Sequence, residues 1–237
     1  MMAAIRYVLS MLWYTFYHAA RIVLAAGRGE PYRPGGIYDE GPRDYARDLA
    51  RVNHLAIHGE GLGQLEGLGP CVFVANHQSW LDIIALLVVL PGTVRFVAKK
   101  ELGQVPLFGR AMRAAGHIEI DRRHLGSAVS AYESAAQVIR SGFSAMVFAE
   151  GTRSRDGRLR PFKKGPFVLA IVAQVPVVPV AILGGYEALP RGSLRPRPVP
   201  LTVRLGTPIP TTGLTYDDRD RLAEQARAAL LGLGLRE

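Results

Sequence analysis

Apolar and polar positions along the chain follow two different periods. Short runs rich in Val, Ile, Leu and Phe, typical of buried strands, alternate with stretches in which apolar residues recur every three to four positions, typical of helices. The strands predicted in this way are His54–His58, Cys71–Ala75, Val94–Ala98, His117–Ile120, Ala145–Phe148, Val177–Leu183 and Leu201–Leu205. The helices predicted between them are Ser79–Leu90, Leu107–Ala115, Ser127–Ser141, Pro166–Ala173 and Asp217–Leu231. This alternation predicts an α/β fold with a largely parallel central sheet flanked by helices.

Residues 3–26 carry a separate helical pattern. The uncharged run between Arg6 and Arg21 is 14 residues long, shorter than the roughly 20 residues that a helix needs to cross a bilayer. At about 100° per residue, the residues divide between a polar face (Arg6, Ser10, Trp13, Tyr17 and Arg21) and an apolar face (Ile5, Leu9, Leu12, Phe16 and Val23). This division favours a helix that lies in the membrane surface. Two alternatives stay open: a secretory signal cleaved at "LAAG", and an amphipathic helix packed on the domain.

The stretch "GRGEPYRPGGIYDEGP" follows this segment and is rich in Gly, Pro and charged residues. Such a composition is typical of a linker or loop. We therefore predict a boundary near residues 27–42. The chain would then consist of a membrane-associating helix with its linker, residues 1–42, and an α/β domain, residues 43–237.

The charge of the chain narrows the classes of partner. Its 29 Lys and Arg residues exceed its 20 Asp and Glu residues, for a formal net charge of +9. Anionic partners are favoured by this excess, whether nucleic acid, anionic lipid or phosphorylated substrates. The single cysteine, Cys71, excludes an internal disulfide and fits a reducing compartment.

The first candidate for chemistry is "ANHQSWLD", residues 75–82, which follows a predicted strand. Ser79 precedes a helical run and Asp82 comes three residues later, the spacing of a helix capping box. The same spacing lets the Asp82 carboxylate fold back onto the His77 ring. Asp82 would then fix the tautomer of His77, whose other nitrogen would be free to act as a general base. Both interpretations of Asp82 remain open from the sequence alone.

A second candidate is "VFAEGTRSRDGRLRPFKKG", residues 147–165. Here a predicted strand leads into a loop with a carboxylate directly after the strand, several glycines, a hydroxyl and many cations, features suited to an anionic ligand at the end of a sheet. The plainer alternative is a solvated basic loop. Other enzyme classes receive less support: the chain has no Gly-x-Ser-x-Gly motif of serine hydrolases, and His54 and His58, although spaced like metal ligands on a helix, lie in a run that alternates like a strand.

Together, and in this order, these stretches resemble the glycerolipid acyltransferases, most closely the bacterial 1-acyl-sn-glycerol-3-phosphate acyltransferases. The resemblance spans roughly residues 55–205. "NHQSWLD" is similar to the first family block and preserves its His-x4-Asp, and "AKKELGQVPLFGRAMRAAGHIEIDR" is similar to the second. "FAEGTRS" resembles the third and "VPVVPVAI" the fourth. In two places the chain departs from the family: Ala149 replaces a proline in the third block, and Glu119 replaces an apolar residue in the second.

The resemblance implies transfer of a fatty acyl group from a thioester, on coenzyme A or acyl carrier protein, to the free hydroxyl of 1-acyl-sn-glycerol-3-phosphate, with no cofactor and no metal. His77 and Asp82 would be catalytic, and Glu150 would orient Arg153 or an acceptor hydroxyl. The resemblance places substrate binding on Asn76, Ser79, Lys99, Arg122, Glu150, Gly151, Thr152 and Arg153.

The expected partners are the lysophospholipid, the acyl donor and an anionic membrane surface, and not nucleic acid. The expected location is the cytoplasmic face of the cell membrane, as a peripheral or monotopic protein. One alternative is a related acyltransferase with a different lysolipid acceptor. The other is a non-catalytic basic peripheral membrane protein, which would explain the charge and the N-terminal helix but not the paired motif blocks.

Overall fold

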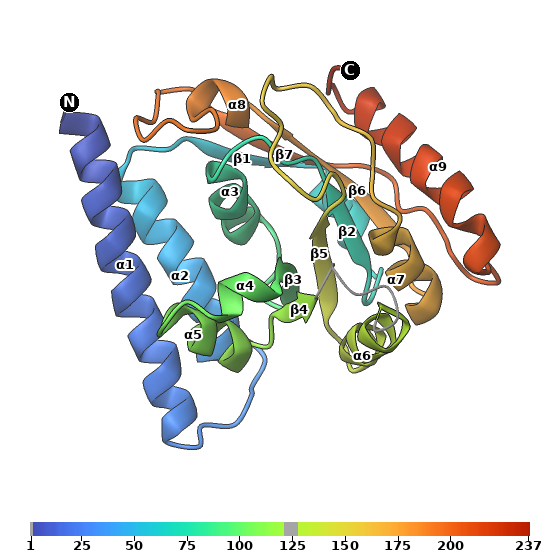
Figure 1. Cartoon of the computed structure of the whole chain (residues 1–237), viewed down its shortest axis with the longest axis horizontal. Coiled ribbons are helices and arrows are strands. Elements are labelled where there is room, and N and C mark those ends of the chain that lie inside the picture. The colour runs from blue at the N-terminus through green and yellow to red at the C-terminus, as the bar shows by residue number, and fades with distance from the viewer. Residues whose placement is uncertain (1, 121–127) are drawn as a thin grey trace.

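The computed structural model describes residues 2–120 and 128–237, and its described strands form one seven-stranded sheet in the order β1-β7-β6-β2-β5-β3-β4 (Figure 1). The strands are β1 (Ile57–Glu60), β2 (Val72–Ala75), β3 (Val94–Lys99), β4 (Ile118–Ile120), β5 (Ser144–Phe148), β6 (Val177–Leu183) and β7 (Leu201–Leu205). Each corresponds to a predicted strand. The first begins three residues later than predicted, because His54 lies in a turn with a positive φ of 52°.

The sheet is largely parallel, as predicted. Only the β6–β7 pair is antiparallel; β2 pairs in parallel with both β5 and β6, and β3 pairs in parallel with both β4 and β5. The carboxyl ends of β2, β3, β4, β5 and β6 therefore meet at one edge of the sheet, where loops of such folds usually bind ligands. Both predicted motif stretches leave the sheet at this edge, after β2 and after β5.

Five of the described α-helices lie where the sequence predicted helices within the domain, and the structure describes four more. The matching helices are α3 (Leu81–Val89), α5 (Phe108–Ala114), α6 (Ala128–Arg140), α7 (Gly165–Ala173) and α9 (Arg219–Gly232). The others are α1 (Met2–Gly27), which was expected from the N-terminal pattern, and α2 (Ile37–Val52), α4 (Lys100–Gly103) and α8 (Gly185–Ala188), which were not. Two 3-10 turns, η1 (Leu62–Leu65) and η3 (Tyr216–Asp218), precede β2 and α9.

Both faces of the central strands are buried, which explains why they are continuous apolar runs. Alternate residues of β2 point to opposite faces: Val72 and Val74 pack with α6, α7 and α9, whereas Phe73 and Ala75 pack with α3 and with Tyr7 of α1. Figure 1 shows the resulting layers, with α1 and α2 outermost on the side of α3.

The predicted linker at residues 27–42 is too long, because α2 begins at Ile37. Pro42 and Gly41 suggested a loop, yet the helix continues through both; Pro42 is its sixth residue, so the helix forms in spite of one missing backbone hydrogen bond. A Cβ on Gly41 would stand 3.0 Å from carbon atoms of Ile22, so this glycine lets α1 and α2 approach closely. The predicted boundary at residue 42 therefore falls inside a helix.

Helix α1 both packs on the domain and leaves an apolar surface open. Tyr7 and Ile22 are buried, and Ser10, expected on a polar face in contact with water, is buried and accepts a hydrogen bond from the Asn53 amide at 2.9 Å. On the opposite side the large apolar residues are exposed, with Leu9 and Leu12 both 61 % exposed. By length and composition α1 is also long and apolar enough to cross a membrane.

Candidate active site

The loop between β2 and α3 brings His77 and Asp82 into contact. Helix α3 begins at Leu81, so Asp82 lies in its first turn and its carboxylate points back along the loop. Nδ1 of His77 lies 2.8 Å from Oδ2 of Asp82. The histidine side chain is 13 % exposed and the aspartate side chain is fully buried. No described residue hydrogen-bonds the other ring nitrogen, Nε2, so this atom is the one available to a substrate.

The two interpretations of Asp82 prove compatible. The same Oδ2 that contacts His77 also accepts hydrogen bonds from the backbone amides of Gln78, at 2.6 Å, and Ser79, at 2.8 Å. These bonds hold the loop against the first turn of the helix, which is one half of a capping box. The other half is not formed: Ser79 Oγ accepts from the amide of Leu81, at 3.1 Å, and not from that of Asp82. Asp82 therefore shapes the loop that carries His77 and also contacts its ring.

Glu150 supports the same loop from the end of β5. Its Oε1 accepts a hydrogen bond from the backbone amide of His77 at 2.7 Å, and its Oε2 accepts one from the amide of Arg160 at 3.0 Å. Burial raises the pKa of Glu150 to about 7, and the two amide bonds oppose this rise. The structure gives its oxygens these two backbone partners, and its expected part in orienting Arg153 or an acceptor hydroxyl stays a prediction.

Asn76 and Ser79 are fully buried and connect the histidine loop to β6 and to the segment that follows it. The Asn76 amide donates to the carbonyl of Ile182 at 2.9 Å and accepts from its amide at 2.8 Å. Ser79 Oγ donates to the carbonyl of Leu189 at 2.8 Å. The structure thus gives both side chains bracing contacts, and their predicted part in substrate binding stays a prediction.

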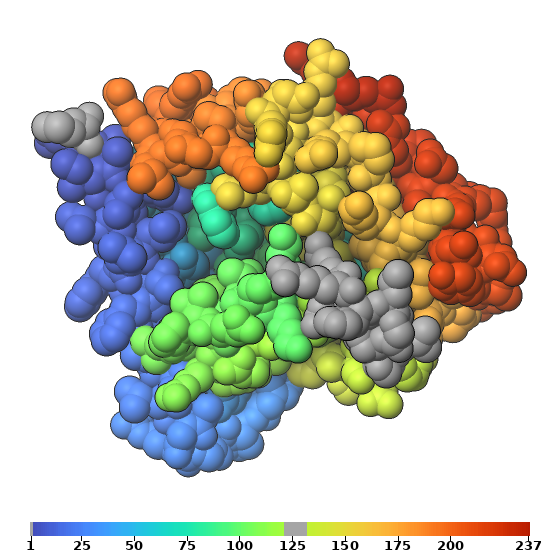
Figure 2. Space-filling view, in the orientation of Figure 1, coloured from blue at the N-terminus to red at the C-terminus, as the bar shows by residue number. Residues whose placement is uncertain are grey.

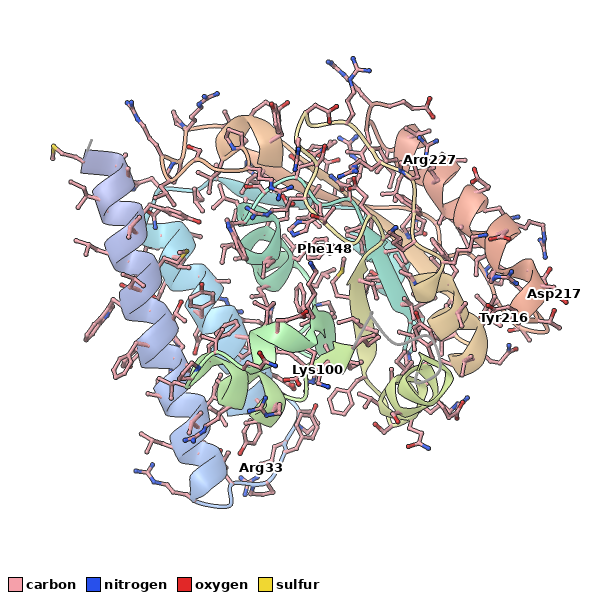
Figure 3. All side chains as sticks on the ribbon, in the orientation of Figure 1. Arg33, Lys100, Phe148, Tyr216, Asp217 and Arg227 are labelled. Carbon is pink, nitrogen blue, oxygen red and sulfur yellow. The ribbon has the colours of Figure 1, made fainter. Side chains whose placement is uncertain are left out.

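Three residues that sequence reasoning missed complete the surroundings of His77. The ring of Phe148 stacks on His77 with centroids 3.9 Å apart, and Figure 3 labels it near the centre of the molecule. Gln78 donates to the carbonyl of Gly157 at 2.7 Å, joining the two motif loops. Trp80 lies under the Arg153 guanidinium, 4.4 Å from the ring centroid. The sequence held no direct signal for these contacts, because they depend on the pairing of β2 with β5, which sets Ala75 beside Phe148 and brings both motif loops to the same edge.

Arg153 is a half-buried cation beside the dyad. Burial lowers its pKa, and the nearby positive charge of Arg191 lowers it further, while the negative charge of Asp82 acts in the opposite direction. In the described part of the chain the Arg153 guanidinium has no carboxylate at ion-pair distance. A cation held on an aromatic ring with its hydrogen-bond donors open suits an anionic group such as phosphate.

The structure relates the other predicted substrate-binding residues less directly to His77 and Asp82. Lys99 is exposed at the carboxyl end of β3, the same edge as His77. Gly151 has a positive φ of 72°, and Thr152 is exposed in the loop after Glu150. Arg122 lies outside the described residues. Glu119, one of the two departures from the family, pairs with Arg113 at 3.1 Å. No cluster of His, Cys, Asp or Glu suited to a metal ion occurs in residues 2–120 or 128–237.

Comparisons with known proteins agree with this geometry. A family model described as "Acyltransferase" matches residues 55–183, more than half of the chain. The chain is 42 % identical over 151 residues to a 1-acyl-sn-glycerol-3-phosphate acyltransferase of Limnanthes douglasii, covering 63 % of this chain and 53 % of the relative. It is 40 % identical over 163 residues to the human 1-acyl-sn-glycerol-3-phosphate acyltransferase alpha, covering 68 % and 58 %.

These matches span about half the length of the curated relatives. A solved structure covers more: the crystal structure of the 1-acyl-sn-glycerophosphate (LPA) acyltransferase PlsC from Thermotoga maritima is 26 % identical, with a TM-score of 0.74 and 98 % of each chain covered. The matched family model includes the histidine loop, the Glu150 loop and the strands that hold them. The chain therefore belongs to the acyltransferase family.

Proposed function

We propose that the protein moves a fatty acyl group from a thioester, on coenzyme A or acyl carrier protein, to the free hydroxyl of 1-acyl-sn-glycerol-3-phosphate, giving phosphatidic acid. The observation that carries the proposal is the His77–Asp82 contact of 2.8 Å, with Nε2 of His77 open at the ligand-binding edge of the sheet. The names of the relatives, all of them 1-acyl-sn-glycerol-3-phosphate acyltransferases, support this choice of acceptor.

In the proposed reaction His77 is the general base. Its Nε2 takes the proton of the acceptor hydroxyl as the hydroxyl oxygen attacks the carbonyl carbon of the thioester. The carbon–sulfur bond then breaks, and the departing thiolate takes the proton back from His77. Asp82 stabilises the imidazolium that exists between these two proton transfers. A positioned base of this kind contributes roughly 10²- to 10⁴-fold to the rate, and the scheme requires neither a covalent enzyme intermediate nor a metal.

The acceptor phosphate is proposed to bind Lys99, Arg122 and Arg153, the cations that the family resemblance suggested for this role. Arg153 is the best supported of these, because its guanidinium lies over the ring of Trp80 beside the dyad. A planar guanidinium can hold two phosphate oxygens at once, which an ammonium cannot do. Gly151 and Thr152 precede Arg153 in the same loop and would contribute polar contacts to the bound acceptor.

The acceptor and the product are both lipids, so the protein is proposed to work at the membrane surface, on its cytoplasmic face, as a peripheral or monotopic protein. The exposed apolar side of α1 supports this placement. Leu9, Leu12 and Phe16 are each about 60 % exposed on one side of the helix, while the other side is fixed to the domain. This is the arrangement expected of a helix lying in one leaflet.

The test is an assay of the purified full-length chain with acyl-coenzyme A and acyl-acyl carrier protein against a panel of short-chain lysolipids. The expected product is phosphatidic acid from 1-acyl-sn-glycerol-3-phosphate, with thiol release that is nearly lost in His77→Ala. His58→Ala, which removes an exposed histidine from β1, serves as the matched control. Preference for another lysolipid would replace the proposed acceptor. Equal thiol release by wild type and His77→Ala would refute the role of His77 as general base. No thiol release with any donor would favour a non-catalytic membrane protein.

A further inference from the structure

The loop between α8 and β7, residues 190–200, has an unusual surface for a connection of this kind. Leu194, near its middle, is 55 % exposed, and three exposed arginines, Arg191, Arg195 and Arg197, surround it in the sequence. Residues 188–200 contain no Asp or Glu. An apolar tip among cations without local acidic partners is costly to leave in water and suits a surface that is both apolar and anionic.

The loop leaves and re-enters the domain beside α1. Leu189 before it and Val199 near its end belong to the same packed cluster as Tyr7, Val8 and Met11 of α1. The amide of Arg197 donates to the carbonyl of Ala188 at 2.8 Å, which closes the loop at its base. Figure 2 shows this loop, in orange, next to the first turns of α1, in blue. The loop therefore projects from the domain beside the amino-terminal half of α1.

The same loop borders the candidate active site. Its first anchor, Leu189, accepts the hydrogen bond of Ser79 in the histidine loop. Arg191 lies two residues further on, close enough to Arg153 for its positive charge to lower the pKa of the Arg153 guanidinium. The loop thus lies at the rim of the site on the side of α1.

We propose that residues 190–200 form a second membrane contact, in which Leu194 enters the interface of an anionic bilayer and Arg195 and Arg197 bind lipid headgroups. This inference rests on the proposed membrane placement of α1 and goes beyond it. A single interfacial helix leaves the domain able to rotate about the helix axis, whereas a second contact fixes that rotation. The active-site rim then faces the bilayer, and a lipid acceptor reaches Arg153 without crossing water.

The first test places an environment-sensitive fluorophore at the tip. Cys71, the one cysteine of the chain, is only 1 % exposed, so Leu194→Cys can be labelled selectively in the full chain. With phosphatidylglycerol-containing vesicles, emission from position 194 should shift to the blue. The matched control is Leu62→Cys in η1, also exposed but at the opposite edge of the sheet, where no shift is expected. A protein that binds vesicles with no shift at position 194, or with equal shifts at both positions, overturns the proposal, and so does a full chain that binds no vesicles.

The second test concerns the arginines. Each basic residue near an anionic surface contributes about 1 kcal/mol, or about fivefold in affinity, so the double variant Arg195→Gln/Arg197→Gln should bind these vesicles about 30-fold more weakly at low salt. The control Arg221→Gln/Arg227→Gln removes two charges from α9, which Figure 3 places on the side of the molecule away from α1. If vesicle binding weakened equally in both double variants, the effect would depend on net charge alone and the proposal would be overturned. Turnover of a soluble short-chain acceptor should stay unchanged in the Arg195/Arg197 variant, which separates this contact from the acyl-transfer reaction itself.

Discussion

Substituting Asp82 by Asn separates the two roles that the structure gives this side chain. Oδ2 accepts three hydrogen bonds, from the His77 ring and from the backbone amides of Gln78 and Ser79. Oδ1 is buried without a hydrogen-bond partner in the described structure and lies against Gly185, where an added Cβ would collide with it. An asparagine keeps all three bonds only if its carbonyl oxygen replaces Oδ2, which leaves its NH₂ group facing Gly185.

From this geometry we expect a moderate loss of stability and a large loss of rate. A buried NH₂ without a partner costs about 1–3 kcal/mol, or roughly 2–10 °C in melting temperature for a chain of this size. The rate should fall more, because a neutral amide does not stabilise the imidazolium that forms on His77. The equivalent change in a serine protease triad lowers kcat about 10⁴-fold, so we expect a decrease of 10²- to 10⁴-fold here.

The assay measures thiol release from the acyl donor with a soluble short-chain acceptor, alongside thermal unfolding of each variant. Asp82→Asn should lower kcat far more than it raises the Michaelis constant for either substrate. In a His77→Ala background the same change should cost stability but no further rate, because the base is already absent. Near-normal turnover in Asp82→Asn with a reduced melting temperature would refute the catalytic role and leave Asp82 a purely structural cap.

Three further predictions concern the surroundings of the dyad. Arg153→Lys should raise the Michaelis constant for 1-acyl-sn-glycerol-3-phosphate more than that for the donor, with the exposed Arg155→Lys as control; equal effects on both substrates would move the phosphate site elsewhere. Because the pKa of Glu150 is raised to about 7, its contribution to stability is complete below about pH 4.5 and is lost as the pH rises through 7. The free energy of unfolding of Glu150→Gln, relative to that of wild type, should therefore rise by up to about 3 kcal/mol between pH 4.5 and pH 8. A difference that does not change with pH would contradict the raised pKa. Leu9→Gln with Leu12→Gln should weaken vesicle binding at least tenfold, since each side chain buries apolar area only in the lipid, and unchanged binding would exclude α1 as a membrane contact.

The structure also changes how the membrane helix can be tested. If residues 1–42 were a helix and linker apart from the domain, as predicted, residues 1–26 could be removed while the rest still folds. Tyr7 and Ile22 are buried against the domain, and Ser10 bonds to Asn53 of the turn after α2, so deletion would expose part of the core. Substitution of exposed residues such as Leu9 and Leu12 avoids this, because it changes the lipid-facing side alone.

The sequence by itself determined the place of every described strand and the family to which the chain belongs. A strand that is buried on both faces of a parallel sheet needs an apolar residue at every position. Residues 71–75 and 177–183 are such runs, so no tertiary information was needed to find them. The five-residue separation of His77 and Asp82 made their contact foreseeable, because a helix that starts between them turns the carboxylate back. Sequence alone also indicated the exposed apolar side of α1.

Only the tertiary structure decided which elements brace the site. Helix α2 was missed because Gly41 and Pro42 disfavour a helix locally, and it is the packing of α1 against this segment that outweighs their preference. The partners of Glu150, Asn76 and the Ser79 hydroxyl are backbone groups up to 110 residues away in the chain. Backbone amides and carbonyls are the same for every residue type, so nothing in a sequence marks which of them a buried side chain will reach until the strands are in register.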